Sequence, residues 1–167
     1  CSSAVIENVC KFFDVTIFYY NPNIYPMEEY VKRKEEQVRL CNILNINFLD
    51  CIFEHCDLSN KDFSNSSVHR VSFNNCNMTL TNFINSGISD VTIDESKCSY
   101  INFASSNLKH FKISNSVINE GRFIDIEGKD YYFDNCDFSR SEFFDISLNG
   151  VDFSNSIIDD IRINTKD

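Results

Sequence analysis

Several features that are common in enzymes and membrane proteins are missing from this sequence. Its 167 residues include no tryptophan, and no apolar run reaches the roughly 18 residues that a membrane-spanning helix needs. No positively charged segment followed by an apolar one precedes a signal cleavage site. A phosphate-binding loop, a dinucleotide fingerprint and a nucleophile elbow are also lacking. We therefore expect a soluble protein that is not an enzyme and that needs no cofactor and no metal.

Positive charge is scarce as well. The 15 lysines and arginines stand against 25 acidic residues, which gives a formal net charge of -10. Nucleic acids and anionic lipids repel such a chain, whereas cationic protein surfaces attract it. The sequence thus predicts a protein partner, with no direct nucleic-acid binding and no membrane binding.

The apolar residues that are present recur with a period of five. Sixteen phenylalanines dominate the aromatic content. Stepping by five from Phe48 to Ile163 gives 24 positions, and only Cys98 and Gly128 among them are not Phe, Leu, Ile, Val or Met. The residue two positions before each centre is mostly small or aliphatic. Because residues two apart share one face of an extended chain, each unit predicts a very short strand with two inward side chains, followed by a bend.

Charged residues avoid both inward positions. Of the 27 charged residues between Ile46 and Thr165, only Lys61 is inward, although a random placement would put about eleven there. The period is therefore a burial pattern, and it predicts a solenoid whose coils stack around a narrow solid core. Gly128 lacks a core side chain, so we expect a local dent or bulge around Glu127–Lys129, or a small irregular loop there.

The cysteines follow the same pattern. Seven of the eight fall at inward positions, whereas a disulfide framework would place them in loops. This pattern predicts buried free thiols and a reducing, cytoplasmic environment. The stretch "CIFEHC" (51–56) is not expected to bind zinc, because Cys51 and Cys56 point inward while His55 points outward.

The units resemble those of the pentapeptide-repeat family, whose pattern is a small residue, Asp or Asn, Leu or Phe, a polar residue and a turn residue. The clearest matches are "CDLSN" (56–60), "TNFIN" (81–85), "CDFSR" (136–140) and "VDFSN" (151–155). The resemblance implies an all-β fold, a right-handed quadrilateral β-helix of about six continuous coils with four units per coil. We expect one domain over 1–167, made of a partial N-terminal coil at 1–19, an inserted loop with a short helix at 20–40 and continuous coils over 41–167.

Two longer stretches, 50–67 and 136–153, are similar to the Qnr-type quinolone-resistance proteins. That resemblance implies a DNA-mimicking protector that binds DNA gyrase or topoisomerase IV and shields it from quinolones. The C-terminal helix that pairs two molecules of those proteins does not follow here, where the chain stops at Asp167, so the resemblance leaves a homodimer open. The alternative is an interaction scaffold, or a fragment of a larger multidomain or effector protein, without a topoisomerase role. Because the chain begins with Cys1 rather than Met, we expect trimmed termini; the alternative is that Cys1 is a lipidated residue exposed by signal removal.

Two adjacent sides of the implied column are acidic. Residues twenty apart stack at about 4.8 Å, and these two sides carry seven of the nine net negative charges of the coils. The candidate partner-binding residues there are Glu54, Asp57, Asp94, Glu95, Asp134, Asp137 and Asp152. They either mimic the charge of DNA, at about half the linear density of the duplex, or only keep the surface soluble.

Two further surfaces are candidates for partner binding. The segment "YPMEEYVKRKEEQVRL" (25–40) predicts a helix with Pro26 near its start. It either grips a partner or covers a coil edge, and its candidate contacts are Tyr25, Tyr30, Lys32, Arg33 and Lys34. An apolar stripe one position past the centres is expected to point outward, where it is either a contact surface or ordinary exposed apolar area; it comprises Ile84, Ala104, Ile124 and Phe144.

Overall fold

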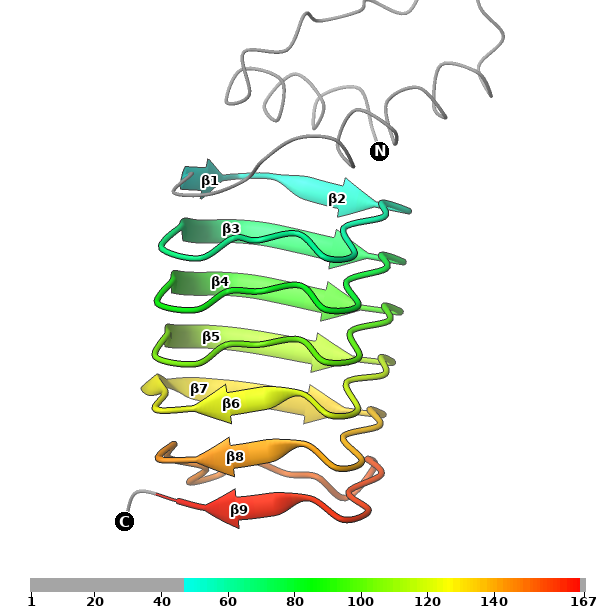
Figure 1. Ribbon diagram of the computed structural model, residues 1–167, viewed down its shortest axis with the longest axis vertical. Helices are drawn as coiled ribbons and strands as arrows, with labels where there is room; N and C mark the ends of the chain where they lie inside the picture. Colours follow the sequence, from blue (N-terminus) through cyan, green and yellow to red (C-terminus); the bar gives the residue numbers. More distant parts are fainter. Residues whose placement is uncertain (1–46, 166–167) are drawn as a thin grey trace, which may run out of the picture.

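The computed structural model describes residues 47–165, so the predicted partial coil at 1–19 and the predicted insertion at 20–40 lie outside the described residues. The described chain winds into coils that stack in a column, with β1 and β2 at one end and β9 at the other (Figure 1). The strands are β1 (Asn47–Leu49), β2 (Ile52–Glu54), β3 (Ser67–Asn74), β4 (Gly87–Asp94), β5 (Asn107–Ser114), β6 (Arg122–Ile124), β7 (Glu127–Asp134), β8 (Glu142–Phe144) and β9 (Arg162–Asn164). No helix in this part of the chain is long and apolar enough to cross a membrane.

Each strand pairs in parallel with a strand of a neighbouring coil, and the paired residues are twenty positions apart in the sequence. Ser67 pairs with Gly87, for example, and Arg122 pairs with Glu142. One sheet has the order β1-β3-β4-β5-β7, with β2 also paired to β3, and a second has the order β6-β8-β9. Isolated β-bridges outside the strands, such as Asp57 to Asn77, also join residues twenty positions apart in the sequence. The expected all-β, four-sided solenoid is confirmed.

The column has four sides, which we name by the apolar centres that each side stacks in steps of twenty. The first side runs from Phe48 to Leu148, the second from Phe53 to Phe153, the third from Leu58 to Ile158 and the fourth from Phe63 to Ile163.

The corners between sides require left-handed backbone conformation. Within residues 47–165, twenty-one residues other than glycine have φ between 47° and 62°, and all of them end a five-residue unit. Asparagine takes this conformation at Asn85 (φ 58°), but even Leu80 takes φ 60° at the same position of its unit. Nearby side chains support the bends, as when the Ser59 amide donates to the Asp57 carboxylate at 3.1 Å. The coil imposes the corner geometry, and Asn and Asp meet it with least strain.

Phenylalanine rings fill the core in file. On the fourth side, stacked ring centroids are separated by 4.7 Å (Phe63 to Phe83), 5.2 Å (Phe83 to Phe103), 5.3 Å (Phe103 to Phe123) and 4.8 Å (Phe123 to Phe143). Small polar residues often occupy the other inward position, where they are buried and hydrogen-bonded. The Ser106 hydroxyl, for example, donates to Phe83 O at 2.6 Å. The five described cysteines are free and buried, as predicted: Cys51, Cys56, Cys76, Cys98 and Cys136.

The irregular loop predicted around Gly128 is wrong. β7 runs through Gly128 without interruption and stays in register with β5. Gly128 has φ 130°, and a Cβ atom built on it would lie 1.7 Å from the carbonyl oxygen of Leu108. The glycine therefore permits a close backbone approach rather than a loop.

The last coil is packed less tightly than the others. Its centres Ile158 and Ile163 are 45% and 50% exposed, because no further coil covers them in the described residues. The centres of the coils above are buried, apart from Gly128.

Candidate protein-binding surface

The structure brings the seven predicted acidic residues together on the second and third sides. Glu54, Asp94, Glu95, Asp134 and Asp152 lie on the second side, and Asp57 and Asp137 lie on the third. Glu95 and Asp152 are exposed and the other five are half-buried. Lys112 is the one cation of the second side within residues 47–165. These two sides form a continuous acidic surface, whose binding role stays a prediction.

Hydrogen bonds keep key carboxylates of this surface ionised. The Ser114 hydroxyl donates to Asp94 at 2.7 Å and the Asn115 amide donates at 2.9 Å, and both lower the pKa of Asp94. The Ser154 amide donates to Asp152 at 2.8 Å and lowers the pKa of that carboxyl group. Both groups therefore carry negative charge at neutral pH.

On the first side, acidic residues alternate at one corner with an arginine and a histidine. The residues that end the first five units of this side, taken one coil at a time, are Asp50, Arg70, Asp90, His110 and Asp130. Arg70 Nε lies 2.5 Å from Asp50 and lowers the pKa of that carboxyl group. His110 lies between two carboxylates, 2.9 Å from Asp90 and 3.3 Å from Asp130. The first side is thus a poorer candidate for long-range attraction of a cationic partner than the acidic sides.

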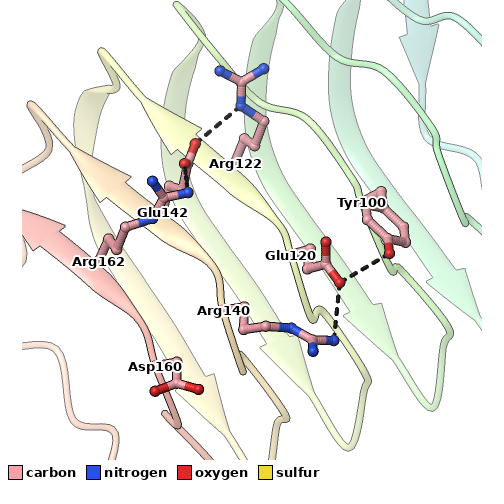
Figure 2. A pocket seen from close by; sticks show the side chains of 7 residues that line it. All are labelled: Tyr100, Glu120, Arg122, Arg140, Glu142, Asp160 and Arg162. Atoms are coloured by element: carbon pink, nitrogen blue, oxygen red, sulfur yellow. Dashed lines mark hydrogen bonds and ion pairs between the residues drawn. The ribbon is translucent and has the colours of Figure 1, made fainter.

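A second alternating network lines a groove of about 490 Å³ at the corner between the third and fourth sides (Figure 2). Arg140 lies 3.0 Å from Glu120, and the Tyr100 hydroxyl donates to Glu120 at 2.9 Å. The guanidinium groups of Arg122 and Arg162 both pair with Glu142. Sequence reasoning missed both networks, although stepping by twenty along the sequence shows the alternating charges.

The apolar stripe and the inserted segment are the two other predicted contact surfaces. The apolar stripe of Ile84, Ile124 and Phe144, which was expected to point outward, lies along the fourth side. Each of these residues is half-buried, so its neighbours cover part of the side chain. Tyr25, Tyr30, Lys32, Arg33 and Lys34 lie outside the described residues.

No group of three His, Cys, Asp or Glu in residues 47–165 has the geometry of a metal site. Burial raises the pKa of the Cys98 thiol, so this cysteine is a packed thiol rather than a nucleophile.

Comparison with known proteins identifies two families. Residues 46–123 match the profile described as Pentapeptide repeat region, and residues 1–78 match the profile of the epoxyqueuosine reductase QueH. Among solved structures, the pentapeptide repeat protein Rfr23 from the cyanobacterium Cyanothece 51142 has a TM-score of 0.50 at 11% identity, over 84% of this chain and 96% of that chain. This likeness shows the fold alone. QnrB1, a plasmid-mediated fluoroquinolone resistance protein, has a TM-score of 0.21 at 15% identity, over 74% of this chain and 90% of that chain, which is too low to carry an argument.

The QueH match corrects the expectation that this chain is not an enzyme. QueH of Acinetobacter baylyi is 46% identical over 55 residues, which are 32% of this chain and 25% of that protein. QueH of Haemophilus influenzae is 40% identical over 55 residues, 32% of this chain and 22% of that protein. The chain thus spans about a quarter of the length of these curated relatives. Where the two profile matches overlap, at 46–78, the described residues form β1, β2 and β3 of the solenoid.

Proposed function

We propose that the acidic second and third sides of this chain, whose residues 46–123 match the pentapeptide-repeat profile, bind the basic surface of a bacterial type II topoisomerase, DNA gyrase or topoisomerase IV, and protect it from quinolones. The observation that carries the proposal is the uneven distribution of charge. The first side has four acidic residues against three lysines and arginines in the described chain, and Arg70 pairs with Asp50. The second side has five acidic residues against Lys112 alone in the same residues. The sequence similarity of 50–67 and 136–153 to Qnr-type proteins supports the choice of partner.

The spacing of the acidic residues supports competition with DNA. Coils stack at about 4.8 Å, so six coils span roughly 29 Å, over which duplex DNA carries about 17 charges. The coils carry nine net negative charges over that height, about half that density, and seven of the nine lie on the two acidic sides. The column is rigid because its core is solid. A basic surface that binds DNA would therefore attract this column at long range, and salt would screen the attraction.

A binding experiment with matched variants tests the proposal. The double variant Glu95→Gln/Asp159→Asn neutralises one exposed residue on each acidic side, and the control Asp125→Asn/Asp145→Asn makes the same charge change on the fourth side. Surface plasmon resonance against immobilised gyrase and topoisomerase IV, over a salt series, should show binding that weakens with salt. We expect the first variant to bind more weakly than the control. Absence of binding to both enzymes at low salt refutes the proposal.

A second candidate function follows from the QueH match. We propose that the segment containing residues 1–46 takes part in the reduction of epoxyqueuosine, the substrate that the name of the matching proteins gives. Incubation of the whole chain with epoxyqueuosine and a chemical reductant, followed by mass spectrometry, should show loss of the epoxide oxygen. An unchanged substrate mass, under conditions in which Acinetobacter baylyi QueH converts it, refutes this second function.

A further inference from the structure

The column opens on its second side, between β7 and the last coil. One coil higher, backbone hydrogen bonds join the neighbouring coils on this side. The backbone N–H of Asn115, for example, donates to Asp134 O at 3.1 Å. Among the described residues, no backbone hydrogen bond joins β7 to residues 147–155. Pairing resumes past the corner, where the Ile157 amide donates to Cys136 O at 2.8 Å. The opening contains a cavity of about 240 Å³ whose walls come from β7 and the last coil.

Tyr131 lines this cavity with an unsatisfied polar group. It holds an inward position that is small or aliphatic in most units, and its side chain is only 8% exposed. Its hydroxyl group is buried and has no hydrogen-bond partner. Burial raises the pKa of Tyr131 to about 12, so the hydroxyl group is neutral at physiological pH and able to accept a hydrogen bond. Buried polar groups without a partner are rare, so this hydroxyl group is a candidate to accept a hydrogen bond from a ligand.

The other walls of the cavity favour a cation. Asp134 and Asp152 both line it, and Asp152 is held in its ionised form by the Ser154 amide. The ring of Tyr132 is 53% exposed and already contacts a cation, because Lys112 Nζ lies 4.9 Å from its centroid. Two carboxylates, an aromatic face and an unsatisfied hydroxyl group together suit a cationic group with several hydrogen-bond donors.

We propose that this cavity receives the guanidinium group of an arginine side chain from a basic protein partner. A guanidinium group is planar, has five N–H donors, stacks on aromatic rings and is weakly hydrated, so it fits these walls better than an ammonium group. A cavity of about 240 Å³ holds one side chain rather than a helix or a strand. The inference rests on the proposed function in one respect: the cavity belongs to the acidic second side, for which it names a recognition chemistry. It does not require the partner to be a topoisomerase.

Gly150 provides a way to close the cavity without breaking the fold. It lines the cavity at a corner with φ 78°, and no atom lies within 4 Å of a Cβ built on it. Asparagine adopts the left-handed corner elsewhere, as at Asn135 with φ 51°. Gly150→Asn should therefore fold normally and fill the space with a side chain.

The test is an NMR titration of the isotope-labelled whole chain with the capped peptide acetyl-Gly-Arg-Gly-amide. The control peptide has citrulline, the uncharged isostere of arginine. We expect amide shifts that cluster at Tyr131, Tyr132 and Asp152, and binding of the arginine peptide about tenfold or more tighter than that of the citrulline peptide. Asp152→Asn should weaken binding by about fivefold or more. The control Asp125→Asn removes a charge from the fourth side, outside the cavity, and should change affinity by less than about twofold.

Three results would overturn the inference: no shifts at the cavity, equal binding of the citrulline peptide, or unchanged binding to Gly150→Asn. Tyr131→Phe adds an independent check, because it should weaken peptide binding while the protein stays folded. The proposed function fails separately. If the peptide binds the cavity but the protein does not bind gyrase or topoisomerase IV, the topoisomerase assignment is wrong and the cavity stands. If gyrase is protected but the peptide does not bind, the cavity inference is wrong.

Discussion

Replacing Gly128 by alanine should destabilise this protein far more than the same change at Gly150. Gly128 lies within β7 at a position that is apolar and buried in the coils above. A Cβ atom there would lie 1.7 Å from Leu108 O and 2.6 Å from Leu108 C. Because both contacts are with backbone, no side-chain rotation relieves them. β7 must move away from β5, which breaks ladder hydrogen bonds on one side of the column.

The magnitude follows from two costs. A residue with a Cβ held at an unfavourable positive φ costs roughly 1–3 kcal/mol, and overpacking against fixed neighbours costs roughly 1–3 kcal/mol more. We therefore expect Gly128→Ala to lower the free energy of unfolding by about 2–6 kcal/mol. For Gly150→Ala, no atom lies within 4 Å of the new Cβ and φ is 78°. Only the conformational cost of about 1–2 kcal/mol applies at that site.

Urea denaturation of both variants and the parent protein, followed by far-ultraviolet circular dichroism in the presence of a thiol reductant, measures the difference. The reductant keeps the cysteines free, as the structure shows for the described ones. Equal loss of stability in the two variants would refute the close approach of Gly128 to Leu108. So would a Gly128→Ala protein as stable as the parent.

Three further predictions concern the core, the cavity and acid stability. Phe103→Ala removes a buried ring stacked between two others and should cost about 4 kcal/mol in urea denaturation, whereas Ile163→Ala, half exposed on the last coil, should cost less than about 1.5 kcal/mol. Tyr131→Phe removes a buried hydroxyl without a partner and should stabilise the protein by about 1 kcal/mol, seen as a higher melting temperature. The carboxyl group of Asp94 has a lowered pKa in the folded state, so it adds stability above its unfolded-state pKa that is lost as pH falls through the folded-state pKa. Asp94→Asn should therefore flatten the acid side of a plot of melting temperature against pH.

The architecture of the described coils was predictable because a single physical rule repeats along the chain. Each unit buries two side chains two residues apart, and the exclusion of charge from those positions, with Lys61 as the exception, set the register from Phe48 onward. Long-range contacts added no ambiguity, since each coil contacts only its neighbours in the stack. The file of phenylalanines from Phe63 to Phe143 follows from the same rule.

The features that could not be predicted are those that the burial rule of the repeat does not determine. Gly128 read as a loop in the sequence, because the close approach to Leu108 is visible only in three dimensions. Tyr131 occupies an inward position that is small or aliphatic in most units, and the repeat pattern does not show that this position lies beside an opening in the column. The charge networks were missed because the net charge of each side was considered, and not the alternation of sign from coil to coil. The QueH-like segment shows no motif of its own, so only comparison with relatives found it.

The most direct test of the central claim is the supercoiling of relaxed plasmid by DNA gyrase in the presence of ciprofloxacin. We predict that the protein restores supercoiling as its concentration rises, and that Asp125→Asn/Asp145→Asn restores it equally well. The variant Glu95→Gln/Asp159→Asn, which neutralises exposed carboxylates of the acidic sides, should need a higher concentration. Failure of the unmodified protein to restore supercoiling, or equal protection by both variants, would contradict the claim that the acidic sides protect the enzyme.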